Sequence, residues 1–162
     1  MMLLLVLFAL GLAAMSPSYG QELKLLHGGC PIFWYSFKGR CYKYIDSLMT
    51  WGEAEVHCLS EGANLVSIHS LEEHNFVNHL IKNFDSTQEI SWIGLTDVHK
   101  EGAWMWSDGS KYNFSIWTDN EPNNANGNEN CGHTSNGQNL YWNDHVCSLK
   151  IRSVCASRTV CP

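Results

Sequence analysis

The side chains best suited to chemistry are a set of oxygen ligands in the second half of the 162-residue chain. Glu121, Asn123 and Glu129 lie within one polar stretch, and Asn143 and Asp144 follow it. Three carboxylates and two amide carbonyls are typical calcium ligands, since Ca²⁺ accepts six to eight oxygens in irregular geometry, whereas zinc sites use Cys and His. The set therefore predicts a calcium site. On composition alone an ordinary solvated loop is the alternative, because Asn and Glu are common there.

Three of these ligands lie in a polar stretch, Thr118 to Gly137, that contains seven Asn and no Val, Ile, Leu or Phe. Such a segment cannot bury itself, so it is predicted to be a long surface loop. Loops of this length in a compact domain are usually functional or disordered. Cys131 within this one indicates a loop tethered to the rest of the domain.

Two helices are predicted ahead of the loop. Thr50 and Glu53 have the capping-box spacing, which predicts a helix over residues 50–60. Ser70 and Glu73 repeat that spacing at the start of a second, amphipathic helix. The apolar residues that share one face of this second helix are Phe76, Val77, Leu80 and Ile81.

Short aromatic and β-branched segments predict strands around these helices. Cys30 to Tyr44 has the pattern of a hairpin with its turn at Lys38-Gly39. The remaining predicted strands are residues 64–68, 91–95, 104–106, 140–142 and 152–155. The sequence therefore predicts an α+β fold, with helices in the first half and strands and loops in the second.

The beginning of the chain has the character of a processed leader. The first 20 residues contain no Asp, Glu, Lys, Arg or His, and residues 3–14 form an apolar run too short to cross a membrane. Ser18 and Gly20 provide the small residues that precede a cleavage site. We expect residues 1–20 to be a secretory signal peptide and residues 21–162 to form one secreted domain with a short C-terminal tail, without membrane insertion.

Charge and residue types exclude several classes of function. The net charge of −6 and the lack of a basic cluster argue against nucleic acid, heparin or anionic lipid as the main partner. No Ser-His-Asp or Cys-His arrangement stands out, and the carboxylates are better explained as metal ligands than as an acid/base pair. We therefore expect a binding protein, not an enzyme.

Seven cysteines in an exported chain predict disulfides, because the secretory pathway is oxidising. No CxxC pair suggests a zinc site. Leaving one cysteine out and pairing the other six gives 7 × 15 = 105 connectivities, and the physics of the sequence does not select one. The seven are Cys30, Cys41, Cys58, Cys131, Cys147, Cys155 and Cys161.

Taken together, these motifs resemble the C-type lectin-like domain, and the resemblance extends from Cys30 to Cys155. Within that family the chain is most similar to small secreted fish lectins, whose scaffold is shared with fish type II antifreeze proteins. The resemblance implies two helices, small antiparallel sheets and a long disulfide-tethered binding loop. The motifs that carry it, besides the ordered cysteines, are Trp92-Ile93-Gly94-Leu95, Glu121-Pro122-Asn123, Glu129 and Trp142-Asn143-Asp144.

The resemblance also implies a set of disulfides and a peptide geometry. Cys30 would pair with Cys41, Cys58 with Cys155, and Cys131 with Cys147. Pro122 would follow a cis peptide bond. Cys161 remains over, and an odd cysteine in a secreted protein suggests an intermolecular bridge, so we expect a disulfide-linked homodimer.

By the same resemblance, the five oxygen ligands would bind both calcium and sugar. Glu121, Asn123, Glu129, Asn143 and Asp144 would coordinate Ca²⁺, and two vicinal sugar hydroxyls would complete its shell. The Glu-Pro-Asn order resembles the mannose-type pattern. Galactose or lactose binding, with or without calcium, is an alternative, and ice binding on the same scaffold is another.

A second, auxiliary calcium site of the family would use four further positions. Asp97 and Glu101 are acidic as that site requires, but Asn124 and Asn130 are neutral amides. We therefore expect the auxiliary site to be weak or empty.

The resemblance also suggests partners and a modification. Glycans on microbial or cell surfaces would be the targets, and a dimer would agglutinate them through avidity, in keeping with innate immunity. Asn113 heads an Asn-Phe-Ser glycosylation sequon.

Overall fold

The computed structural model describes residues 24–135 and 139–157. The expected signal peptide and Cys161 lie outside these residues. The helices are α1 (Trp51–Ser60), α2 (Leu71–Phe84) and a short 3-10 helix η1 (Ala125–Gly127). The strands are β1 (Tyr35–Phe37), β2 (Arg40–Met49), β3 (Ala63–Leu65), β4 (Ser91–Thr96), β5 (Met105–Trp106), β6 (Cys131–Thr134), β7 (Trp142–His145) and β8 (Ile151–Ser157).

The strands join into one sheet with the order β1-β2-β8-β4-β6-β7, while β3 pairs with β8 and β5 with β4. All of these pairs are antiparallel except β4 with β8, which run parallel. The α+β class and the two helices are as the sequence predicts. The expected small sheets are connected through the β4–β8 pair, which joins the hairpin end of the molecule to the β6–β7 end.

Both helices begin where the sequence predicts. At α1 the Thr50 hydroxyl accepts from the backbone N–H of Glu53, whose carboxylate accepts from the Thr50 N–H, so the capping box is complete. At α2 the Ser70 hydroxyl accepts from the N–H of Glu73, but the Glu73 carboxylate accepts from His69 N–H instead. Neither α1 nor α2 is long and apolar enough to cross a membrane.

The Glu73 carboxylate does not complete a capping box because it binds side chains on β2 instead. Its Oε1 accepts from Arg40 Nη1 at 2.6 Å and from the Tyr42 hydroxyl at 2.6 Å, and both of these residues lie on β2. The ion pair is buried, and Arg40 also donates to the carbonyl of Ser67. The first turn of α2 is thereby fixed to β2, and no charge of the pair is left without a partner.

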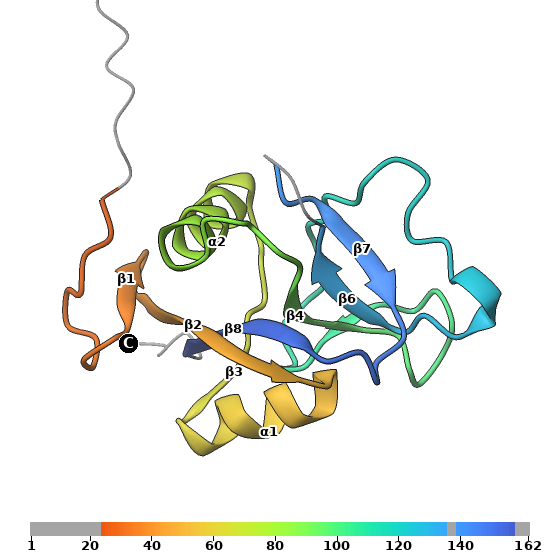
Figure 1. Cartoon of the computed structure of the whole chain (residues 1–162), viewed down its shortest axis with the longest axis horizontal. Coiled ribbons are helices and arrows are strands. Elements are labelled where there is room, and N and C mark those ends of the chain that lie inside the picture. Colours follow the sequence, from red (N-terminus) through yellow and green to blue (C-terminus); the bar gives the residue numbers. More distant parts are fainter. Residues whose placement is uncertain (1–23, 136–138, 158–162) are drawn as a thin grey trace, which may run out of the picture.

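The two helices lie on opposite sides of the central strands β2, β8 and β4 (Figure 1). Each covers its own apolar cluster. On the α2 side, Phe76 and Ile81 pack with Trp106, Trp142 and other buried side chains. On the α1 side, the cluster includes Ala54, Leu65 and Trp92, together with Cys58 and Cys155.

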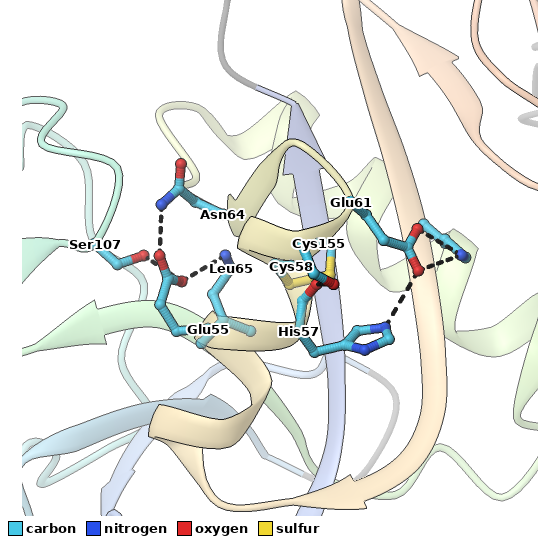
Figure 2. Close-up of a disulfide and its surroundings, with 10 residues drawn as sticks. Glu55, His57, Cys58, Glu61, Asn64, Leu65, Ser107 and Cys155 are labelled. Atoms are coloured by element: carbon cyan, nitrogen blue, oxygen red, sulfur yellow. Dashed lines mark hydrogen bonds and ion pairs between the residues drawn. A yellow bond between two sulfur atoms is a disulfide. The ribbon is translucent and has the colours of Figure 1, made fainter.

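Figure 2 shows how α1 is attached to the strands. Cys58 and Cys155 form a disulfide between α1 and β8. Beside it, the Glu55 carboxylate accepts from Leu65 N–H at 2.8 Å and from the Ser107 hydroxyl at 2.9 Å. One carboxylate on α1 therefore connects β3 to the turn after β5.

The other two disulfides are Cys30–Cys41 and Cys131–Cys147. All three pairs are those that the family resemblance implies. The first closes the hairpin that begins the sheet, and the last connects the start of β6 to the segment after β7.

Three predictions about element boundaries are wrong. The strand expected over residues 140–142 shares only Trp142 with β7, which continues to His145. The strand expected over residues 64–68 is β3, which ends at Leu65, although Val66 N–H still bonds to the carbonyl of Val154. The polar stretch expected to be surface loop as far as Gly137 contains β6, which is buried throughout. Its burial comes from its neighbours: β6 pairs with β4 on one side and β7 on the other, so its small and polar residues need no apolar pattern of their own.

Candidate functional site

The candidate site is built on β6 and β7, at the end of the sheet away from β1 (Figure 1). Asn143 and Asp144 lie on β7, opposite His133 and Gly132 of β6. Gly132 is needed here because a Cβ at this position would lie 2.9 Å from the Cβ of Leu95. This close approach of β6 to β4 places β7, and with it two of the five proposed ligands, at a fixed position beside the loop.

The loop of residues 118–130, hereafter the binding loop, supplies the other three. The loop begins beside β7, where Thr118 N–H donates to the carbonyl of Trp142. The Glu121–Pro122 peptide bond is cis, as the resemblance implies. Asn120, Asn124 and Asn126 have positive φ, a conformation that Asn adopts more readily than most residues. The abundance of Asn in this loop therefore has a backbone reason as well as a chemical one.

Asp144 holds the binding loop against β7. Its side chain is buried, and its two oxygens accept from the backbone N–H groups of Asn123 at 3.1 Å and Asn124 at 2.8 Å. A carboxylate accepting two backbone N–H groups fixes the direction of the chain immediately after Pro122. Asp144 thus orders the loop in addition to being a possible cation ligand.

Glu121, Asn123 and Glu129 have partners within the loop. Asn123 Nδ2 donates to Glu121 Oε1 at 2.8 Å. Glu129 Oε2 accepts from Ala125 N–H at 3.0 Å, across η1. The structure therefore gathers the three loop ligands and the two β7 ligands around one end of the sheet.

Two oxygens of this set are buried and have no hydrogen-bond partner among residues 24–135 and 139–157: Glu121 Oε2 and Asn143 Oδ1. Buried oxygens without a donor are costly unless something else neutralises them. Burial, together with the nearby Asp144 and Glu129 carboxylates, raises the pKa of Glu121 to about 7. Free lone pairs and mutually repelling carboxylates are the conditions that a hard cation relieves, so the residues fit calcium.

The fit depends on the amides as well as the acids. In the described part of the chain, no group of three or more His, Cys, Asp and Glu side chains is placed to hold a metal ion, so Glu121, Glu129 and Asp144 do not form such a group by themselves. The donor set is therefore of mixed carboxylate and carbonyl type. Such a set is typical of calcium and unlike the Cys and His sets of zinc.

The four residues of the expected auxiliary site are also brought together, and Asp97 Oδ1 is buried without a hydrogen-bond partner among the described residues. Asp97 is buried, and its Oδ2 accepts from Gly102 N–H at 2.7 Å. Asn130 is held through its main-chain carbonyl, which accepts from Asp97 N–H. Asn124 Nδ2 donates to Glu101 Oε2 at 2.5 Å. Desolvation and the Asp97 and Asp144 carboxylates raise the pKa of Glu101.

Asn124 is the residue that sequence reasoning undervalued. The sequence marks it only as a neutral amide where the family has an acid, whereas the structure gives its side chain two hydrogen bonds inside the site. Its position directly after the Glu-Pro-Asn motif is the one signal that could have suggested such a role.

Asn113, the first residue of the glycosylation sequon, is exposed on the segment between β5 and the binding loop. His69 Nδ1 lies 3.1 Å from its Oδ1. Ser115 is exposed as well, while Phe114 packs against the α2-side cluster. The sequon is thus accessible on the folded surface, and glycosylation at Asn113 stays a prediction.

Comparisons with known proteins agree with this architecture. The family profile described as "Lectin C-type domain" matches residues 47–157. The lactose-binding lectin l-2 of Anguilla japonica is 42% identical over 147 residues, which cover 88% of this chain and 87% of that protein. The galactose-specific lectin nattectin of Thalassophryne nattereri is 39% identical over 127 residues, 78% of this chain and 79% of that protein.

Solved structures give the same result. The C-type lectin CEL-I from Cucumaria echinata matches with a TM-score of 0.78 at 30% identity, over 81% of this chain and 99% of that one. A calcium-independent type II antifreeze protein matches with a TM-score of 0.74 at 29% identity, over 86% of this chain and 99% of that one.

Proposed function

Because this chain belongs to the C-type lectin family, a non-enzymatic family of carbohydrate-binding proteins, we propose that it binds sugar through calcium at the end of its binding loop. The observation that carries the proposal is the pair of buried oxygens, Glu121 Oε2 and Asn143 Oδ1, that have no donor among the described residues. Glu121, Asn123, Glu129, Asn143 and Asp144 would hold the ion.

The side chains of this site would divide the recognition of two neighbouring sugar hydroxyls. Carboxylates only accept hydrogen bonds, so Glu121 and Glu129 would accept the hydroxyl protons. The amide groups of Asn123 and Asn143 would donate to the hydroxyl lone pairs. Bound calcium would supply the electrostatic attraction that lets a sugar hydroxyl displace water.

The order of acceptor and donor along the loop favours a mannose-type sugar, with neighbouring equatorial hydroxyls. In the structure these two side chains are bonded to each other, with Asn123 Nδ2 donating to Glu121 Oε1 at 2.8 Å. The names of two relatives favour a second candidate, galactose or lactose. Within the pair of neighbouring 3- and 4-hydroxyls that would meet the ion, the two candidates differ in the 4-hydroxyl, which is equatorial in mannose and axial in galactose.

Retention on mannose and lactose resins, each with calcium and then with a chelator, tests the proposal. Retention on mannose that is lost on chelation is the expected result. Calcium-dependent retention on lactose would support the calcium site and would mean that the site selects galactose-type sugars instead of mannose-type ones. Retention on either resin that survives the chelator would contradict the calcium mechanism. No retention on either would contradict sugar binding, and thermal hysteresis would then test ice binding, which the antifreeze match favours.

We also propose that the protein is secreted after removal of residues 1–20 and forms a homodimer through Cys161. Two weak sites on one dimer would bind a dense glycan surface roughly 10² to 10⁴ times more tightly than one site, which is the physical basis for agglutinating microbes or cells. Non-reducing electrophoresis of the secreted protein should show a dimer that Cys161→Ser abolishes. A monomer from the unsubstituted chain would contradict the proposal.

A further inference from the structure

Besides the turn bond that its backbone carbonyl accepts from Gly127 N–H, Asn124 makes three hydrogen bonds that connect separate parts of the site. Its backbone N–H donates to Asp144 Oδ2 at 2.8 Å. Its side-chain Oδ1 accepts from Glu129 N–H at 3.0 Å, and its Nδ2 donates to Glu101 Oε2 at 2.5 Å. Two of its partners are proposed calcium ligands, and the third lies in a separate loop 23 residues earlier in the chain.

The contact with Glu101 connects the binding loop to a rigid neighbour. Glu101 lies in the tight turn after β4, where Lys100 N–H bonds to the carbonyl of Asp97 and Gly102 N–H bonds to the Asp97 carboxylate. This turn also contacts the far end of the binding loop, where Asp97 N–H and the Thr96 hydroxyl both donate to the carbonyl of Asn130. The binding loop is therefore held to the β4 turn at two points, Asn124 and Asn130.

The chemistry of position 124 requires an amide. One side-chain atom must accept from an N–H and the other must donate to a carboxylate, and the amide of Asn offers both groups on one short planar side chain. Asp would still accept from Glu129 N–H but would place a second carboxylate oxygen against Glu101, in a region already occupied by Asp97 and Asp144. The Asn124 backbone is in the left-handed region, with φ 45° and ψ 50°, which Asn tolerates better than a longer side chain.

We propose that Asn124 is the positioning residue that assembles the binding loop before any cation binds. Its side chain joins the Glu101 carboxylate to the backbone N–H of Glu129, and its backbone N–H binds the Asp144 carboxylate. This inference rests on the proposed function for the role of the loop, and concerns the loop's order in the calcium-free protein. Asn124 performs with neutral hydrogen bonds the ordering that an added cation between acids would otherwise supply.

An exchange of acid and amide tests the link between the two loops. Asn124→Asp breaks it, Glu101→Gln alone preserves it because a glutamine oxygen still accepts from Asn124, and the double variant restores it with donor and acceptor reversed. The measurement is hydrogen exchange in a chelator at the backbone amides of Asn124, Ala125 and Glu129. Core amides of β4 and the urea midpoint report whether each variant remains folded.

In Asn124→Asp we expect these three amides to exchange at least about fivefold faster than in the unsubstituted protein, as the loss of one or two hydrogen bonds implies. In Glu101→Gln and in the double variant they should remain within about twofold of it. Equal exchange in Asn124→Asp, or no restoration in the double variant, would overturn the proposal. If Asn124→Asp does not fold, Asn124→Ala replaces it, with the same fivefold increase expected and unchanged exchange counting against the proposal. Failure of the sugar-resin test would leave these calcium-free and sugar-free results unaffected, so the two proposals fail separately.

Discussion

At the scale of single residues, the candidate site was predictable in composition but not in its internal contacts. Residue types and the family resemblance select five proposed oxygen ligands, because calcium chemistry restricts which side chains serve, and calcium binding by these five stays a prediction. They do not reveal that Asp144 is buried and accepts two backbone N–H groups, since those donors lie 20 and 21 residues earlier in the chain. Contacts of that kind depend on the packing of β7 against the loop.

Asp144→Asn should weaken calcium binding by at least about tenfold, because it removes one ligand charge and turns an amide N–H₂ towards one of the two backbone donors that Asp144 now satisfies. Calcium titration followed by tryptophan fluorescence or calorimetry measures the change. Asp119→Asn is the matched control, since Asp119 is an exposed residue in the same loop and undergoes the same change of charge. Equal calcium affinity in Asp144→Asn and the unsubstituted protein would contradict the assigned role.

The buried side chain of His133 is expected to lower the free energy of unfolding in mild acid. Burial lowers its pKa to about 4, against an ordinary value near 6.5. Below pH 6.5 the His133 side chain therefore binds a proton in the unfolded chain but not in the folded one. The contribution of His133 to the free energy of unfolding falls as the pH drops from about 6.5 to 4, by up to about 3 kcal/mol. Burial also lowers the pKa of His74, which acts in the same direction.

Urea unfolding at several pH values between 7 and 4, in a chelator so that calcium does not contribute, measures this dependence. His133→Gln should remove the histidine contribution to this pH dependence, because glutamine does not titrate. Asp85 and Asp108 have lowered pKa values, so their contribution is lost only below about pH 4 and does not overlap the histidine range. Glu121, whose pKa is raised to about 7, acts in the opposite direction over the histidine range, because the folded chain binds a proton there that the unfolded chain has lost. The difference between the unsubstituted protein and His133→Gln therefore gives the histidine contribution. An unchanged slope in His133→Gln would show that other groups cause the effect.

At the scale of elements, the helices were predictable to within a residue because their start signals are local. Thr50 and Ser70 accept hydrogen bonds from the N–H groups three residues on, and both bonds are set by sequence spacing. Strand β6 was not predictable, since its Cys, Gly, His and Thr residues have no apolar alternation. Its burial is imposed by β4, which is distant in the chain, on one side and by β7, the next strand, on the other.

Gly94 of β4 shows how closely the elements approach one another. A Cβ there would lie 2.6 Å from the carbonyl oxygen of Leu65 and 2.8 Å from the Ser107 hydroxyl. Gly94→Ala should therefore destabilise the fold by about 2 kcal/mol or more, because the backbone of β3 must move. Gly52→Ala is the control: no atom lies within 4 Å of its Cβ, and alanine in α1 should stabilise by up to about 1 kcal/mol. Urea unfolding compares the two, and an equal effect would contradict the steric reason.

At the scale of the whole molecule, the sheet connects two regions that the sequence separates. The hairpin β1–β2 and the β6–β7 pair meet only through β8 and β4, the one parallel contact. Parallel pairing of strands so far apart leaves no local signal, which is why the β4–β8 link between the small sheets was not predicted. The disulfide pairs were predictable only through the family resemblance, since the spacing of seven cysteines allows 105 arrangements.

The Cys58–Cys155 disulfide should contribute most to global stability, because it closes the longest loop. The sequence separations of the three pairs are 97, 16 and 11. In the chain-entropy description a loop near 100 residues is worth about 4.7 kcal/mol and one near 15 about 3 kcal/mol. Cys58→Ala with Cys155→Ala should therefore lower the free energy of unfolding by about 2 kcal/mol more than Cys30→Ala with Cys41→Ala.

Urea unfolding of the two double variants measures that difference. Both remove one covalent link and two sulfur atoms, but Cys58 and Cys155 lie in the α1-side cluster whereas Cys30 and Cys41 lie at its margin. Removing the buried sulfur atoms of Cys58 and Cys155 also leaves a cavity, which lowers the free energy of unfolding further. The difference between the two double variants should therefore be at least as large as the entropic difference. Equal stability of the two variants would mean that the unfolded chain already keeps α1 near β8, and that the disulfide acts on a compact unfolded state instead of an extended one.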